Sequence, residues 1–259
     1  MSSRCRPCLG TFVKISLGGC SYLPNKFERA YAAIEEIQRL MSRHDQDSEL
    51  SQINKTPVGQ WIKINPKLSK VLRFGLALQR FTQGSYTLGV GASKSTLRDT
   101  DFSKPQFEIQ GQKCRRLQNI KIDLGGIAKG FAVDQAVRVL KSTDKRLFGC
   151  VSAGGDLRVF GAYPQDVYIR PQNSRLKKAF QVSVKNMSVS SSEVISKRKI
   201  FYFDVRKKQF LRDSSKTFAS IAAPSCMISD ALTKVALLCD SKVFRSVASK
   251  FGASPLVIV

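Results

Sequence analysis

Apolar and polar positions along the chain recur with the periods of helices and strands. Apolar side chains at steps of three and four residues predict helices at residues 27–41, 66–82, 127–140, 227–239 and 241–250. Alternating or short apolar runs predict strands at residues 9–17, 107–109, 120–122, 147–152, 157–161, 166–170, 179–185, 199–204, 218–223 and 255–259. The polar residues 42–48 predict a loop. Most strands follow one another without an intervening helix and no linker interrupts them, so we expect one α+β domain over residues 1–259, with a mostly antiparallel sheet flanked by helices.

Charge is the most unusual feature of the composition. The chain carries 43 Lys and Arg against 19 Asp and Glu, a formal net charge of +24, which attracts polyanions of any kind. The basic residues are densest at 197–199, 206–208 and 212–216, where a solvated hairpin edge is the favoured interpretation. The aromatic residues 201–203 beside this run keep a nucleic-acid or membrane-surface binder as an alternative that is not favoured.

The cysteines and the N-terminus bear on the compartment. Seven cysteines without a repeated spacing predict reduced thiols rather than a disulfide framework. Cys5 and Cys8 have the spacing of half a zinc site, but the sequence has no second pair and its only histidine is His44, so zinc is not favoured. No signal peptide and no transmembrane run of about 18 apolar residues is evident, and we expect a cytoplasmic protein.

Two glycine pairs and one charged helix are candidates for chemistry. Asp123-Leu-Gly-Gly126 precedes a predicted helix, where glycines permit close backbone approach, free amides favour anions and Lys129 adds a cation. The alternative is a tight turn. Val151–Asp156 contains a second glycine pair, which either lines the same site or forms a hairpin turn. Asp230 and Lys234 lie four residues apart on one helix face, and periodicity alone favours an exposed ion pair there.

Five segments resemble, in order, the motifs of the ApbE family of FAD:protein FMN transferases. Ile122–Asp134 is the most diagnostic of them and matches almost letter for letter. The other four are Arg6–Phe12, His44–Asn54, Val151–Asp156 and Pro224–Leu238. The match extends over most of the chain and implies the ApbE-like fold.

The resemblance also implies an activity and a set of site residues. Members bind FAD with Mg²⁺, cleave the pyrophosphate and pass FMN to a threonine of an acceptor protein. The implied FAD contacts are Leu9, His44, Ser85, Tyr86, Thr87, Asp123, Lys129 and Phe203. The implied metal site comprises the Gly126 carbonyl and the Asp230 side chain, with Lys234 at the position of a family threonine.

Three departures from the family pattern, at Thr87, Phe201 and Lys234, bear on catalysis. Thr87 stands in place of an aspartate, and Phe201 stands where the family has the histidine implicated in transfer, so the catalytic group is not identified. A flavin- or nucleotide-binding protein without transfer activity is therefore the main alternative. We hypothesise that the Lys234 ammonium partly replaces magnesium.

Overall fold

The helices of the computed structural model follow the predicted periodicity closely. The structure describes residues 1–19, 24–90, 94–171, 179–194, 203–205, 209–210 and 216–259. Its helices are α1 (Pro24–Met41), α2 (Glu49–Lys55), α3 (Pro66–Phe81), α4 (Lys94–Asp99), α5 (Ala128–Thr143), α6 (Cys226–Leu238) and α7 (Ser241–Lys250). The five predicted helices are all present. The short, polar helices α2 and α4 were not predicted, although α2 begins at an N-cap in which Ser48 accepts from the Ser51 amide.

An antiparallel seven-stranded sheet forms the main layer. Its strands, in spatial order, are β1 (Ser2–Cys8), β2 (Thr11–Gly18), β6 (Phe148–Ala153), β7 (Asp156–Phe160), β10 (Ser188–Glu193), β13 (Phe218–Ala223) and β14 (Ser254–Ile258). Every neighbouring pair is antiparallel. This confirms the α+β class with a mostly antiparallel sheet.

Three smaller sheets complete the described strands. One consists of β3 (Ile62–Lys63), β5 (Lys113–Arg116) and β4 (Phe107–Gln110); the second pairs β8 (Gln165–Ile169) with β9 (Phe180–Val184); the third pairs β11 (Phe203–Asp204) with β12 (Gln209–Phe210). The strand predicted at 199–204 falls on described residues only from 203 onward. Most of the basic run between 197 and 216 also lies outside the described residues.

Strand β10 is buried although its sequence is rich in serine. The Ser190 hydroxyl lies 2.8 Å from that of Ser229, and the Ser192 hydroxyl lies 2.7 Å from that of Thr233, so β10 is hydrogen-bonded to α6 through side chains. These pairs satisfy hydroxyl groups that burial would otherwise leave without partners. Strand β10 was not predicted from the sequence because its interior-facing residues are mostly serines rather than apolar residues.

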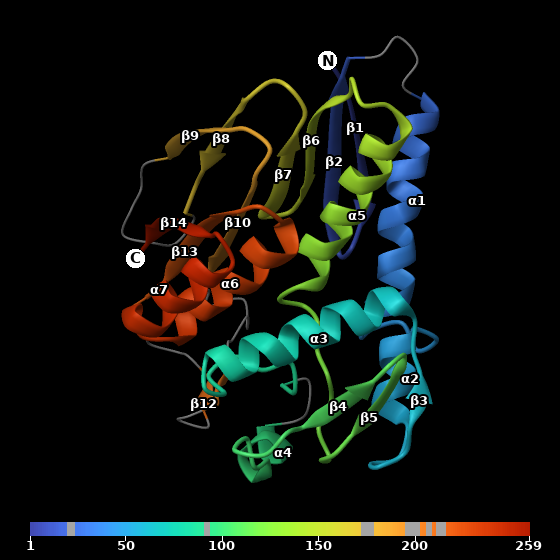
Figure 1. The fold of residues 1–259 in the computed structure, drawn as a ribbon, viewed down its shortest axis with the longest axis vertical. Helices are drawn as coiled ribbons and strands as arrows, with labels where there is room; N and C mark the ends of the chain where they lie inside the picture. The colour runs from blue at the N-terminus through green and yellow to red at the C-terminus, as the bar shows by residue number, and fades with distance from the viewer. Residues whose placement is uncertain (20–23, 91–93, 172–178, 195–202, 206–208, 211–215) are drawn as a thin grey trace.

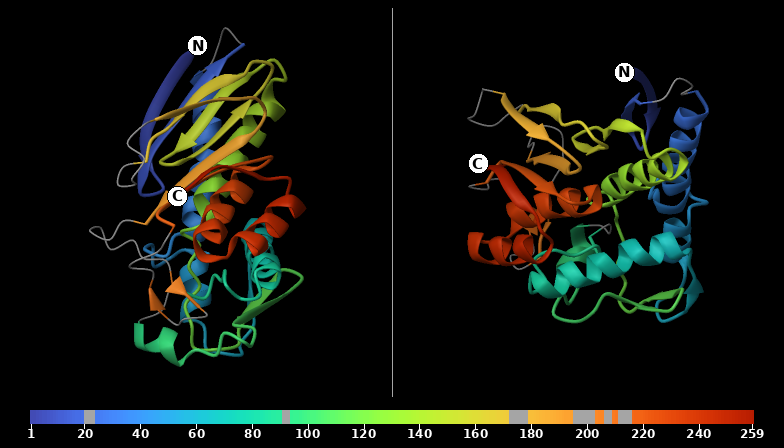
Figure 2. Two further views of the ribbon diagram at one scale, coloured as in Figure 1. Left: turned by 90° about the vertical axis from the view of Figure 1, so that its left-hand side faces the viewer. Right: turned by 45° about the horizontal axis from the view of Figure 1, so that its top comes forward.

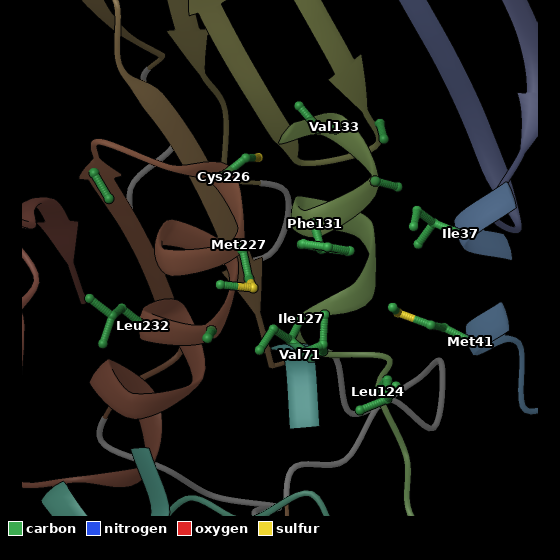
Figure 3. Packing of buried hydrophobic residues seen from close by; sticks show 14 of the residues in the cluster. Ile37, Met41, Val71, Leu124, Ile127, Phe131, Val133, Cys226, Met227 and Leu232 are labelled. Carbon is green, nitrogen blue, oxygen red and sulfur yellow. The ribbon is translucent and has the colours of Figure 1, made fainter. Parts of the chain in front are cut away.

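Helices α1, α5 and α6 cover one side of the main sheet (Figure 1). Helix α3 crosses between these helices and the small β3–β5–β4 sheet, which lies at the far end of the molecule from the N-terminus (Figures 1 and 2). In the core, Phe131 of α5 lies between Met227 of α6 and Ile37 of α1 (Figure 3). Helix α5 is thus the central helix of this layer. None of the described helices combines the length and apolar composition needed to cross a bilayer.

Candidate functional site

Asp123 organises the turn that leads into α5. Its Oδ1 accepts the Gly125 amide at 2.8 Å, which closes the turn, and its Oδ2 accepts from the Arg43 guanidinium at 2.9 Å. The Asp123 amide in turn donates to the Leu88 carbonyl at 2.8 Å. The turn therefore joins the end of α1, the loop after α3 and the start of α5 at one place.

The segment before Asp123 is extended but is not a strand. The Ile122 amide donates to Asn54 Oδ1 at 2.7 Å, and Asn54 Nδ2 donates to the Ile122 carbonyl at 2.9 Å. One side-chain amide thus satisfies both backbone groups that a neighbouring strand would have bonded. The strand predicted at 120–122 is wrong for this reason, and β5 lies instead at Lys113–Arg116.

A basic cavity of about 260 Å³ adjoins this turn. Its walls include Arg43, His44, Lys55 and Lys121. His44 Nε2 accepts from Arg43 Nε at 3.3 Å, and the same guanidinium holds Asp123, so the structure brings His44 into the neighbourhood of Asp123. The concentration of cations in a concave surface suits an anionic ligand.

Four charged residues meet beside the N-terminus of α5. Lys129 Nζ donates to Asp156 Oδ2 and lies 3.8 Å from Asp230 Oδ2. Lys234 Nζ donates to Asp230 Oδ1 and, at 3.0 Å, to the Asp230 carbonyl. We call these residues the charge quartet. It contains two ammonium groups and two carboxylates contributed by α5, β7 and α6.

Three members of the quartet are buried and Lys129 is partly exposed, so the exposed ion pair that periodicity favours for Asp230 and Lys234 is wrong. Asp230 is 0% and Lys234 only 7% exposed because α6 packs against both α5 and the sheet. The hairpin turn predicted as one alternative for Val151–Asp156 is present, and a site role for Asp156 stays a prediction. Asp156 follows the β6–β7 turn at Gly154, where φ is +65°, and its carboxylate contacts Lys129.

Burial and neighbouring charges shift the pKa values of the quartet in different directions. Burial raises the pKa of Asp156, and the Asp230 carboxylate raises it further, outweighing the lysines. Burial also acts to raise the pKa of Asp230, but the Lys129 and Lys234 ammonium groups lower it below its usual value. Burial acts to lower the pKa of Lys129, and Asp230 and Asp156 overcome this and raise it. Lys129 and Asp230 therefore keep their charges at neutral pH.

The N-terminal amides of α5 and of α6 each donate to a carboxylate of the other helix. Asp230 of α6 accepts the Gly130 amide of α5 at 3.0 Å, while Asp134 of α5 accepts the Cys226 and Met227 amides of α6, both at 2.9 Å. A Cβ at Gly130 would overlap the Cys226 carbonyl, so only glycine allows this close crossing. Each carboxylate occupies the favourable position at the positive end of the other helix. We call this arrangement the reciprocal cap.

Sequence reasoning did not identify Arg43 or the role of Asp134. Arg158 also contacts Asp134, and the Ser225 hydroxyl donates to it at 2.8 Å. Asp134 lies within the recognised motif, but its partners in α6 are about 90 residues away in the chain. Local sequence therefore does not identify them.

Two buried polar atoms near the quartet have no hydrogen-bond partner among the described residues. They are the Tyr86 hydroxyl and Asp156 Oδ1. Burial, followed by the charges of Asp230 and Asp123, raises the pKa of Tyr86 well above its usual value, so its hydroxyl remains a donor. Buried polar groups without hydrogen-bond partners are costly. The Tyr86 hydroxyl and Asp156 Oδ1 are therefore candidates for hydrogen bonds to a ligand.

The remaining residues expected to contact FAD lie in different surroundings. Leu9 has φ +57° in the β1–β2 turn, and its amide donates to Gln38 Oε1 at 2.6 Å. The Thr87 hydroxyl donates to Gln106 Oε1 at 3.0 Å, within the protein. Ser85 is buried, and Phe203 packs against Phe102 with ring centroids 5.8 Å apart. Their contacts with FAD stay predictions. Phe201 lies outside the described residues.

The donor set around Asp230 does not fit Mg²⁺. Mg²⁺ requires several oxygen ligands in octahedral geometry, whereas both Asp230 oxygens already accept from nitrogen donors. No group of three or more His, Cys, Asp or Glu side chains that could hold a metal occurs in the described part of the chain. Lys234 contributes a positive charge where a ligand to the metal would stand.

Comparisons with known proteins identify the family. The model of the ApbE family matches residues 9–254, nearly the whole chain. The chain belongs to the ApbE family. Two curated relatives are the FAD:protein FMN transferases of Haemophilus influenzae, 26% identical over 90% of this chain and 78% of its own length, and of Chlamydia pneumoniae, 24% identical over 85% and 77%.

Solved ApbE structures share the fold. The ApbE protein of Thermotoga maritima superposes with a TM-score of 0.82 at 20% identity, covering 100% of this chain and 96% of its own. The apo form of the Pseudomonas stutzeri flavinyl transferase ApbE gives 0.80 at 17% identity, covering 97% and 89%. At these identities the likeness establishes the ApbE fold.

Proposed function

We propose that this ApbE-family protein is a FAD:protein FMN transferase. The observation that carries the proposal is the assembly of Asp123, Lys129 and the two carboxylates Asp156 and Asp230 around the N-terminus of α5. Glycine turns and cations at a helix N-terminus suit a diphosphate. FAD is the substrate, and the acceptor is a protein with a threonine available for flavinylation. The free thiols of the six cysteines that the structure describes support a cytoplasmic location.

The reaction moves a phosphoryl group between two oxygens. The threonine hydroxyl oxygen bonds to the FMN phosphorus, the bond from that phosphorus to the bridging oxygen breaks, and AMP leaves with the bridging oxygen. Lys129 stabilises the negative charge that develops on the phosphate oxygens. Asp123 is held by Arg43 and Gly125 and thereby fixes the turn beside the diphosphate.

Asp156 is our candidate acceptor for the threonine proton. Its pKa is raised by burial, which brings a carboxylate closer to the range useful for general base catalysis, and its Oδ1 has no partner in the described part of the protein. Magnesium, expected from the family resemblance, has no role in this proposal because the donor set does not accommodate it.

The test is incubation with FAD and an acceptor protein that carries a flavinylation threonine, followed by in-gel flavin fluorescence and mass spectrometry. Asp123→Ala should abolish the covalent signal, and Asp156→Asn should slow it by about 10²- to 10⁴-fold, the usual contribution of a general base. Asp166→Asn, at an exposed position of strand β8, is the matched control. FAD binding without any covalent transfer would refute the proposal in favour of a flavin-binding protein without transfer activity.

A further inference from the structure

Lys234 lies between the two residues that the family pattern assigns to the metal. Its ammonium contacts Asp230 Oδ1, and its aliphatic stem passes close to Gly126, where an added Cβ would lie 3.2 Å from Lys234 Cε. The lysine therefore fills the space between the Gly126 backbone and the Asp230 carboxylate. A cation bound by both of these residues would have to displace it.

Both carboxylate oxygens of Asp230 already accept hydrogen bonds from nitrogen donors. Oδ1 is taken by Lys234, and Oδ2 accepts the Gly130 amide at 3.0 Å and faces the Lys129 ammonium at 3.8 Å. Asp230 is fully buried, so water does not compete for these contacts. Removing Lys234 without a replacement charge would leave the buried Asp230 carboxylate with the Lys129 ammonium, at 3.8 Å, as its charged partner, which is unfavourable.

The charge balance of the quartet leads to the same result. Without a nucleotide, the two ammonium groups neutralise the two carboxylates, so the quartet has no excess negative charge to attract a divalent cation. A diphosphate can instead use the lysines. Lys234 donates two of its three N–H groups to Asp230, and the Lys129 side chain is 31% exposed and within reach of a ligand.

We infer that the Lys234 ammonium takes the position of a divalent cation between Gly126 and Asp230, and that the site binds a nucleotide diphosphate without that cation. The identity of the ligand rests on the proposed function; the exclusion of the metal rests on the Lys234 contacts alone. Lys129 and Lys234 together supply two positive charges to the quartet. Because an ammonium imposes no octahedral geometry, it needs none of the additional oxygen ligands that magnesium requires.

Two measurements on the full chain test the inference. The first is Mn²⁺ binding to the protein without nucleotide, followed by electron paramagnetic resonance. Wild type should bind no Mn²⁺ that Mg²⁺ displaces, whereas Lys234→Thr should gain such a site. The second is FAD affinity, followed by flavin fluorescence in EDTA and in excess Mg²⁺. Wild type should change by less than about twofold, while Lys234→Thr should bind at least about tenfold more weakly in EDTA and recover in Mg²⁺.

Lys242→Thr is the matched control, since Lys242 is an exposed helical lysine in α7 and should behave as wild type. A displaceable Mn²⁺ site in wild type, or a gain of more than about tenfold in wild-type FAD affinity on adding Mg²⁺, would overturn the inference. If Lys234→Thr does not fold, as judged by circular dichroism, the wild-type measurements decide. Failure of FAD to bind in either condition would refute the proposed function and the diphosphate half of the inference, while the Mn²⁺ measurement would still decide whether Lys234 excludes the metal.

Discussion

The Asp134 carboxylate should contribute strongly to stability, and Asp134→Ala tests this. Four donors converge on it: the Cys226 and Met227 amides at 2.9 Å, the Ser225 hydroxyl at 2.8 Å, and the Arg158 guanidinium. The alanine variant would leave two helix amides and a guanidinium without their acceptor.

The expected loss can be worked from these contacts. The Asp134 and Arg158 side chains are only 11% and 23% exposed, so the pair is largely desolvated. Breaking a buried pair by removing one partner costs about 3–5 kcal/mol, and partial exposure puts this pair near the lower end, at about 3 kcal/mol. For a domain of this size that corresponds to a fall in Tm of roughly 6–12 °C. Asp134→Asn retains an acceptor oxygen and should cost about 1–2 kcal/mol.

Urea unfolding followed by circular dichroism measures the difference. Asp166→Ala provides a control because Asp166 is exposed and accepts a hydrogen bond from the exposed Gln181 side chain; it should change the free energy of unfolding by no more than about 0.5 kcal/mol. An Asp134→Ala variant that lost less than about 1 kcal/mol would show that water or another residue satisfies the α6 amides equally well. The reciprocal cap would then not be a source of stability.

Two further predictions concern the same region. Gly130→Ala should cost about 2–3 kcal/mol in urea unfolding, because the added Cβ would lie 2.8 Å from Asp230 Cβ and overlap the Cys226 carbonyl, forcing the helices apart; a neutral effect would show that they separate freely. The charge of Lys129 should not limit FAD affinity between pH 6 and 9: its pKa is raised in the folded protein, so its contribution is fully present below the ordinary lysine pKa and is lost only as pH rises through the folded value. A binding titration that fell over this range in wild type but not in Lys129→Met would contradict this assignment.

Periodicity predicted the elements whose burial depends on apolar side chains. All five amphipathic helices were found because their buried positions are apolar and regularly spaced. Elements held by polar contacts were missed. The interior of β10 is serine bonded to Ser229 and Thr233, and the extended segment at Ile122 is bonded by Asn54 rather than by a strand. Local sequence identifies neither the Ser229 and Thr233 partners of β10 nor the Asn54 partner of Ile122.

The candidate site shows the same division. The motif around Asp123 and Lys129 identified the turn and the cation because both lie within one local segment. Arg43 lies 80 positions from Asp123, and the donors to Asp134 at the start of α6 lie 91 to 93 positions away, so only the fold brings them together. The burial of Lys234 was also beyond reach, since the i,i+4 spacing with Asp230 is the same for an exposed pair and a buried one.

The reciprocal cap explains why one carboxylate can serve both the fold and the site. Asp230 stabilises α5 by accepting the Gly130 amide, and the same carboxylate fixes the ammonium groups of Lys129 and Lys234. Asp134 holds the N-terminus of α6, so it sets where Asp230 lies four residues further along that helix. A ligand at the start of α5 therefore meets cations whose positions are determined by the packing of two helices. We conclude that stability and nucleotide affinity are coupled here, and that substitutions which loosen the α5–α6 crossing weaken both.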